Sequence, residues 1–232
     1  MEQSSTLTAQ RCSIDPDLIG KGFYSPAEAA RLARIPRRLL ADWRRAGIIF
    51  PTIEVQINDE PVEQGYTFAS LIYLRLLRML RENKIPLLGS IKALRALEYR
   101  FGPPGEGWAN ARIFVYRREI VGFQPDEWQF TSVSRGNQKI ADSLFGDEFA
   151  ALKDRPDSLL VPKEFQPFVA LDPTVRDGAP TVIGTTITTG VLHRLLQRLH
   201  KLEEVHASYP DIALSQIAGA IRYEEFLDAA AA

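Results

Sequence analysis

Four arginines gather in one short stretch of the N-terminal third of the chain. They form the pairs Arg37-Arg38 and Arg44-Arg45, and Trp43 directly precedes the second pair. The guanidinium fork fits guanine O6 and N7 in the DNA major groove, so arginines near the start of a helix can reach base edges. Those near its end suit phosphates. The stretch therefore predicts a surface that binds nucleic acid.

The residues around these arginines predict the elements that hold them. Ser25, Pro26 and Glu28 are typical of a helix start with a capping box. Ile35-Pro36 forms a tight joint, because proline disfavours helix in the residue before it. A second helix is expected over about 36–46, with Gly47 suited to end it. Two helices across a short joint, the second one rich in arginine, are typical of a helix-turn-helix.

A hairpin and two further helices are expected next. Residues 53–57 alternate apolar and polar side chains and predict a strand. Residues 64–67 can form the second strand, which pairs back with the first. This hairpin corresponds to a wing. Apolar periodicity then predicts helices over about 68–83 and 90–99.

Charge is distributed unevenly along the chain, although the whole carries a net charge of only −1. Residues 23–101 hold 13 Lys and Arg against 8 Asp and Glu, a net of +5. Residues 102–232 hold 13 against 18, a net of −5. This asymmetry favours a nucleic-acid-binding segment followed by a part with another task.

The remaining sequence predicts a middle segment and a helical C-terminal domain. Strands are expected over 112–121 and 128–133, and a helix over 138–152. The C-terminal helices are expected over about 185–199, 201–208 and 212–227, in a trihelical, homeodomain-like arrangement. The last of them is poor in basic residues, with Arg222 followed by Glu224 and Glu225. Because such acids repel phosphate, this domain is expected to contact protein or to self-associate.

The predicted fold class is therefore mainly α with a small β component. The expected parts are a flexible lead-in at 1–22, a winged helix-turn-helix at 23–101, a short β/α segment at 108–160 and the helical domain at 165–228.

Enzymatic and membrane roles find little support in the residues. The three histidines, His193, His200 and His206, do not have metal-ligand spacing, and Cys12 is the only cysteine. Asp172 and Asp177 flank turn residues and are expected to form turns. No apolar run approaches a membrane span or a signal peptide core. We expect a cytoplasmic, non-enzymatic protein without a cofactor or a bound metal.

Residues 23–97 resemble the winged helix-turn-helix of the MerR type. The resemblance rests on SPAEAARLARIPRRLLADWRRAGII, on Gly65-Tyr66 and on YLRLLRMLRENKIPLLGSIKAL. It implies that double-stranded DNA is contacted by Arg37, Arg38, Trp43, Arg44, Arg45 and Tyr66. Two positions depart from the family: Ala41-Asp42 replace its usual Arg-Tyr pair, and Thr67 replaces an arginine after the wing.

Residues 168–227 resemble a small domain of unknown function that recurs in a group of VapB-type antitoxins. The matching features are Asp172-Pro173, the turn at Asp177-Gly178, the stretch GTTIT, Tyr209-Pro210 and the final helix with Ile221-Arg222-Tyr223.

This second resemblance implies a type II antitoxin that represses its own operon and neutralises a PIN-domain ribonuclease toxin. It also implies a homodimer on a palindromic operator, and basic residues that block the toxin's acidic site. The candidates for that contact are Arg155, Arg176 and Arg222. Two alternatives stay open: a stand-alone MerR-like transcription regulator, and a protein-interaction adaptor that has lost DNA binding.

Overall fold

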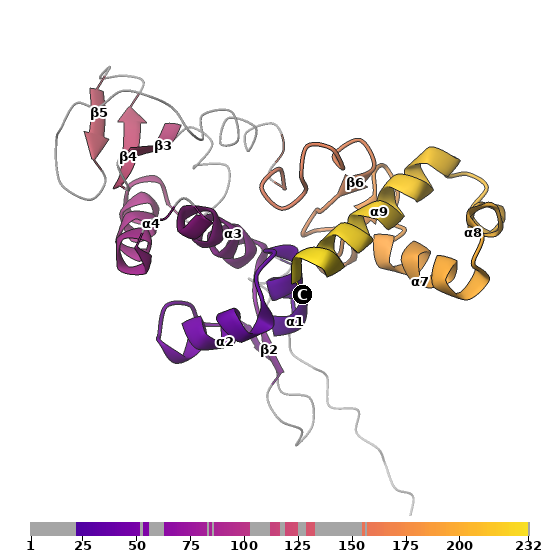
Figure 1. The fold of residues 1–232 in the computed structure, drawn as a ribbon, viewed down its shortest axis with the longest axis horizontal. Helices are drawn as coiled ribbons and strands as arrows, with labels where there is room; N and C mark the ends of the chain where they lie inside the picture. The colour runs from indigo at the N-terminus through magenta and orange to yellow at the C-terminus, as the bar shows by residue number, and fades with distance from the viewer. Residues whose placement is uncertain are drawn as a thin grey trace, which may run out of the picture.

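The computed structural model describes residues 22–51, 53–55, 63–82, 84, 86–102, 112–116, 119–124, 129–132, 155 and 157–231. Within these ranges the chain is mainly helical, with seven α-helices and small antiparallel sheets (Figure 1). No helix in the described ranges has an apolar run long enough to cross a lipid bilayer.

The first two helices are short, and the residues at their ends define where they begin and stop. Helix α1 covers Pro26–Leu32. Its predicted capping box is confirmed: the Glu28 amide donates to Ser25 Oγ at 3.3 Å, and the Ser25 amide donates to the Glu28 carboxylate at 3.0 Å. Helix α2 covers Arg37–Arg45 and starts after Pro36. Gly47 follows it at φ 67°, a left-handed conformation that glycine adopts without strain.

Two short strands follow. Strand β1 (Ile53–Val55) pairs antiparallel with β2 (Glu63–Gly65), with Glu54 opposite Gln64. Immediately after β2, Tyr66 forms a β-bridge to Tyr24, just before α1. This bridge ties the strand pair to the start of the first helix. Residues 56–62 of the predicted hairpin lie outside the described residues.

Two longer helices come next, α3 (Phe68–Glu82) and α4 (Leu87–Phe101). The Ser70 amide donates to Thr67 Oγ1 at 3.3 Å, so Thr67 caps α3. Helix α4 begins three residues before the predicted start at Ser90. The reason is local: Pro86, at φ −56°, occupies the N-cap position and leaves Leu87 free to begin the helix.

The middle segment contains a three-stranded antiparallel sheet of β3 (Arg112–Tyr116), β4 (Glu119–Gln124) and β5 (Gln129–Ser132). The prediction of one strand over 112–121 was wrong, because Val115 pairs with Ile120 across a reversal of the chain. Alternation predicts extended backbone but does not show where it turns. The predicted helix at 138–152 lies outside the described residues.

The C-terminal part is built around its last helix. Strands β6 (Val169–Ala170) and β7 (Thr181–Val182) pair antiparallel, and the short 3₁₀ helix η2 (Arg176–Gly178) lies between them. Helices α7 (Thr189–Leu199) and α8 (Leu202–Ser208) follow, and both pack against α9 (Leu214–Ala231). Helix α7 begins four residues later than predicted. Thr185 Oγ1 instead closes a turn, donating to the Val182 carbonyl at 3.0 Å and accepting from the Ile187 amide at 3.1 Å.

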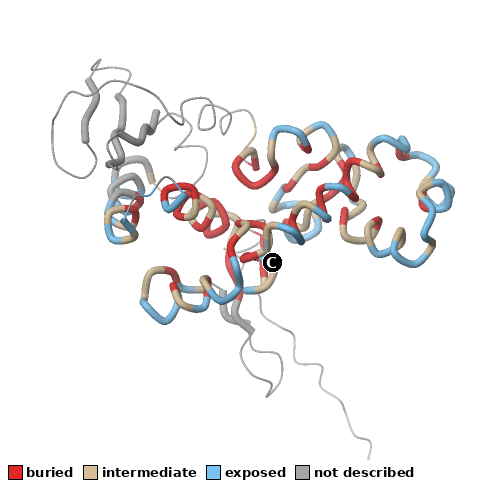
Figure 2. The backbone as a smooth tube through the Cα atoms, viewed as in Figure 1, coloured by how far each residue is buried: buried red, intermediate tan, exposed pale blue. Residues whose placement is uncertain are grey.

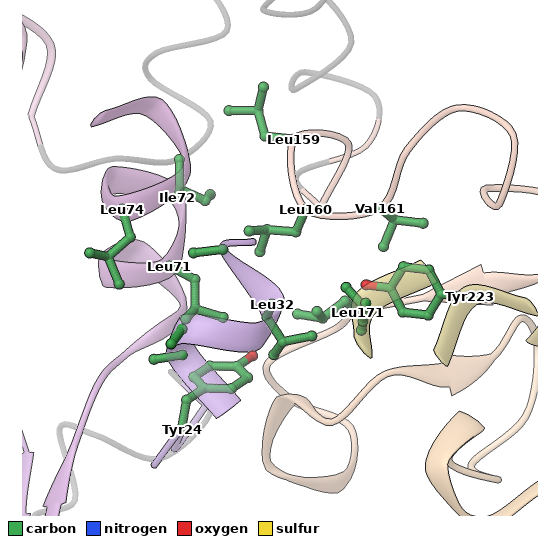
Figure 3. Packing of buried hydrophobic residues seen from close by; sticks show 14 of the residues in the cluster. Tyr24, Leu32, Leu71, Ile72, Leu74, Leu159, Leu160, Val161, Leu171 and Tyr223 are labelled. Carbon is green, nitrogen blue, oxygen red and sulfur yellow. The ribbon is translucent and has the colours of Figure 1, made fainter. Parts of the chain in front are cut away.

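The N-terminal and C-terminal parts share one core. Buried positions run from α3 through α1 into α9 (Figure 2). Figure 3 shows Leu71 and Ile72 of α3 on one side of this core and Tyr223 of α9 on the other, with Leu160 between them. Burial of these apolar side chains stabilises the docking of α1 on α9.

Hydrogen bonds between the N-terminal and C-terminal parts fix their relative orientation. The Tyr24 hydroxyl donates to the Gly178 carbonyl at 3.0 Å. An Arg34 Nη donates to the Leu159 carbonyl at 2.8 Å. Both donors belong to the N-terminal part and both carbonyls to the C-terminal part, so these bonds fix how the two parts meet.

Stability is expected to fall at alkaline pH because of two buried tyrosines. Burial raises the pKa of Tyr24 and of Tyr223 above the ordinary value of about 10. A raised folded-state pKa adds stability below the unfolded pKa, and that stability is lost as pH rises beyond it. The two tyrosines should therefore leave the free energy of unfolding, measured by urea titration, unchanged up to about pH 10 and lower it above that pH. Tyr24→Phe should make the decrease shallower; an unchanged slope would contradict a role for Tyr24.

Candidate nucleic-acid interface

A hollow of about 850 Å³ lies beside α2. Its walls combine the four arginines of the helix with Phe50, Pro51 and Tyr66. Phe50 is 63% exposed, which is unusual for a side chain of its size. Guanidinium groups around an exposed aromatic ring suit an anionic, partly flat ligand such as nucleic acid.

Burial of one side of α2 turns the arginines outward. Leu40 and Trp43 are 3% and 4% exposed and pack into the core. Arg37 and Arg44 are seven residues apart, two turns or about 10 Å along the same stripe of the helix. Arg38 and Arg45 form a second stripe beside the first. All four are exposed, so α2 presents two rows of cations to solvent.

Most of this positive charge is uncompensated. Arg45 forms an ion pair with Asp42 one turn earlier, and both side chains are well exposed. Within the described part of the chain, Arg37, Arg38 and Arg44 form no ion pair. Three cations on one helix face therefore remain available to phosphates.

Two of the residues predicted to contact DNA are buried. Trp43 is 4% exposed and Tyr66 is 1% exposed. The Trp43 indole packs into the core beneath α2, and the DNA contact predicted for it stays a prediction. Tyr66 lies at the base of the hollow, where burial raises its pKa and the nearby charge of Arg44 opposes that rise.

The three arginines predicted to contact a toxin are not brought together. Arg155 is used inside the fold: Nε donates to Asp157 at 2.8 Å, one Nη donates to the Gln166 carbonyl at 2.6 Å, and the other donates to the Val169 carbonyl. These internal acceptors hold the guanidinium of Arg155, and the partner contact predicted for it stays a prediction.

Arg176 and Arg222 are exposed on separate elements. Arg176 lies in η2 and donates from Nε to the Thr186 carbonyl at 3.1 Å. It lines a second hollow of about 290 Å³ together with Glu28 and Arg31. Arg222 lies on α9 above the Phe168 ring, 5.8 Å from its centroid, a cation–π distance.

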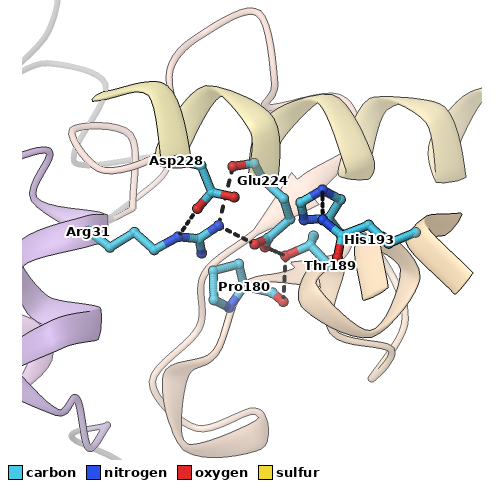
Figure 4. Close-up of polar contacts among 7 residues, drawn as sticks. Arg31, Pro180, Thr189, His193, Glu224 and Asp228 are labelled. Carbon is cyan, nitrogen blue, oxygen red and sulfur yellow. Dashed lines mark hydrogen bonds and ion pairs between the residues drawn. The ribbon is translucent and has the colours of Figure 1, made fainter. Parts of the chain in front are cut away.

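A polar cluster between α1 and α9 is absent from the sequence-based predictions (Figure 4). An Arg31 Nη donates to the Glu224 carboxylate at 2.6 Å, and Arg31 Nε donates to Asp228 at 2.7 Å. Thr189 Oγ1 also bonds to Glu224, which is only 4% exposed. Nothing in the spacing of residues so far apart along the chain indicates that they meet.

The histidines show no metal site. His193 shares a hydrogen bond of 3.2 Å with Gln197, one turn along α7. Among the residues that the structure describes, no group of three or more His, Cys, Asp or Glu is placed to hold a metal ion.

Comparison with known proteins places part of the chain in a family. Residues 169–223 match the model of a family described as "Protein of unknown function (DUF433)". The chain therefore carries a DUF433 domain in its C-terminal part. No curated protein matches the chain.

A solved structure of another protein shares the fold. The X-ray crystal structure of Rv2018 from Mycobacterium tuberculosis superposes with a TM-score of 0.52 at 18% sequence identity. The match covers 85% of this chain and 96% of that chain. At this identity the likeness concerns the fold alone.

Proposed function

We propose that this chain is a DNA-binding antitoxin of a type II toxin–antitoxin system, which represses its own operon and neutralises a PIN-domain ribonuclease. The observation that carries the DNA-binding half is the face of α2, where Arg37, Arg38 and Arg44 are exposed and form no ion pair with any residue that the structure describes. Uncompensated cations on a helix face are the main source of affinity for the DNA backbone.

The arrangement around this face supports a winged helix-turn-helix of the MerR type. Helix α1, the joint at 33–36 and helix α2 follow in the order of a helix-turn-helix, and the β1–β2 pair takes the place of the wing. In this role α2 enters the major groove, with Arg37 and Arg38 nearest the base edges and Arg44 on phosphate. Asp42, one of the departures from the family, pairs with Arg45 and with no other cation in the described part of the chain.

The antitoxin half of the proposal rests on the C-terminal part. The DUF433 match covers the region that resembles a domain of VapB-type antitoxins. The exposed charged side chains of its last helix are Arg222, Glu225 and Asp228, and Asp228 pairs with Arg31. Such a surface disfavours DNA and suits a protein partner.

Alanine at both Arg37 and Arg38 is expected to lower the affinity for the chain's own upstream DNA by about 30-fold or more. Binding should also depend less steeply on salt. The slope of log K against log salt concentration should become shallower by about two if both arginines contact phosphates, or base edges next to phosphates. Fluorescence anisotropy of a labelled duplex, measured from about 50 to 200 mM salt, gives both quantities. Circular dichroism checks that the variant is folded.

Arg194→Ala with Arg198→Ala is the matched control, because it removes two exposed arginines from α7. It should leave DNA affinity within about twofold, since a remote charge acts only through screened long-range attraction. If the wild-type chain binds no duplex even at low salt, the DNA-binding proposal fails and the adaptor alternative takes its place.

Co-expression with the product of the adjacent reading frame tests the antitoxin half. A stable complex in which a PIN-like ribonuclease is inactive is the expected result. DNA binding without such a complex would instead favour the stand-alone regulator.

A further inference from the structure

Helix α7 has one face with a distinct chemistry. Its eleven residues, TGVLHRLLQRL, include no acid. Thr189 and Leu192 are buried against the rest of the domain, while Arg194, Gln197 and Arg198 are exposed. These three positions are three and four residues apart, so their side chains lie next to one another on the outer side of the helix.

The two arginines of this face are uncompensated. Within the described part of the chain neither Arg194 nor Arg198 forms an ion pair, whereas Lys201 just beyond the helix pairs with Glu204 at 3.2 Å. Arg155, in contrast, is held by internal acceptors. Arg194 and Arg198 thus form a pair of neighbouring exposed cations on α7, whereas Arg222, another exposed arginine of the DUF433 domain, lies on α9 against the Phe168 ring.

The geometry of the face favours a protein over DNA. Arg194 and Arg198 are one turn apart, about 6 Å along the helix, which suits a pair of carboxylates. A longer row of phosphates would meet Glu203 and Glu204, which are exposed in the first turn of α8. A second copy using the same face across a two-fold axis would set arginine against arginine.

The position of α7 leaves the α2 hollow clear. In Figure 1, α7 and α8 lie at one end of the molecule, while α2 lies toward the other. A partner on the outer face of α7 therefore does not compete for the arginines of α2.

We propose that the outer face of α7, formed by Arg194, Gln197 and Arg198, is the docking surface for an acidic protein partner. This inference rests on the proposed function, under which the partner is the ribonuclease and its carboxylate cluster receives the two arginines. Gln197 can donate a further hydrogen bond to the same cluster.

Charge reversal on α7 tests the proposal in the full-length chain. Arg194→Glu with Arg198→Glu should weaken binding of the purified adjacent-frame product by about 30-fold or more, as expected when close charge pairs are turned from attractive to repulsive. The control is Lys92→Glu with Lys163→Glu, which changes the net charge by the same amount at exposed positions outside α7. Its effect should stay within about threefold, as for charges at or beyond the rim of an interface.

Three further readouts separate the possible results. Binding is measured by surface plasmon resonance, folding by circular dichroism and DNA affinity by anisotropy. Loss of partner binding in the α7 variant alone, with DNA affinity retained, supports the proposal. Equal losses in both variants, or none in the α7 variant, overturn it while leaving the antitoxin function in place. Failure of the wild-type chain to bind the product removes the proposed function, and the inference with it.

Discussion

Replacing Gly219 with alanine is expected to lower the free energy of unfolding by about 3 kcal/mol. Alanine in a helix interior normally stabilises by up to about 1 kcal/mol relative to glycine. Here a Cβ at Gly219 would lie 2.2 Å from Cγ of Phe168, far inside van der Waals contact. Urea denaturation followed by circular dichroism measures the change.

The sign of this effect should reverse when the ring is removed. In a Phe168→Ala background, Gly219→Ala should be neutral or stabilising by up to about 1 kcal/mol, because only helix propensity remains. The double-mutant cycle isolates the contact from the separate cost of losing the ring. Equal destabilisation in both backgrounds would mean that the close approach of α9 to Phe168 is not the cause.

Local structure in the N-terminal part could be predicted closely from the sequence. The capping box at Ser25, the joint before Pro36 and the glycine after α2 each follow from interactions between near neighbours. Such signals depend on backbone sterics and on hydrogen bonds within a few residues, so they persist whatever the tertiary context.

The direction of side chains was harder to predict, although part of the signal was present. Trp43 lies three residues after Leu40, which places it on the apolar side of α2 and predicts burial. The resemblance to the MerR type led instead to its assignment as a DNA contact. Periodicity is the better guide at such positions, since it reports which face packs.

Long-range pairing could not be predicted from one sequence. Arg155 was assigned to a partner because it is basic, yet its acceptors include the Gln166 and Val169 carbonyls, whose positions depend on the fold. The meeting of Arg31 with Glu224 likewise joins residues 193 positions apart. Charge and spacing contain no signal for contacts of this kind.

The proposed DNA surface and the proposed partner surface are connected through α1. This helix packs against α2 on one side and against α9 on the other. The Arg31 cluster lies on the α9 side of this arrangement. Its strength therefore determines how firmly the DUF433 domain is held relative to the arginines of α2.

Replacing Arg31 with methionine is expected to lower the free energy of unfolding by about 3 kcal/mol. The substitution leaves the Glu224 carboxylate, whose side chain is 5% exposed, without its cation. Asp228→Asn is the matched control, because Asp228 bonds to the same guanidinium but is 56% exposed. Its cost should stay below about 1 kcal/mol, as is usual for solvated ion pairs.

The double variant Arg31→Met with Glu224→Leu should be more stable than Arg31→Met alone. Removing the stranded carboxylate also removes the cost of burying an unpaired charge, and apolar groups of similar size can fill the space. Chemical denaturation at constant pH gives all the values of this cycle. If Arg31→Met and Asp228→Asn cost the same, the Glu224 pair is no stronger than a surface ion pair. The apolar core between α1, α3 and α9, with the hydrogen bonds of Tyr24 and Arg34, then holds the two parts together.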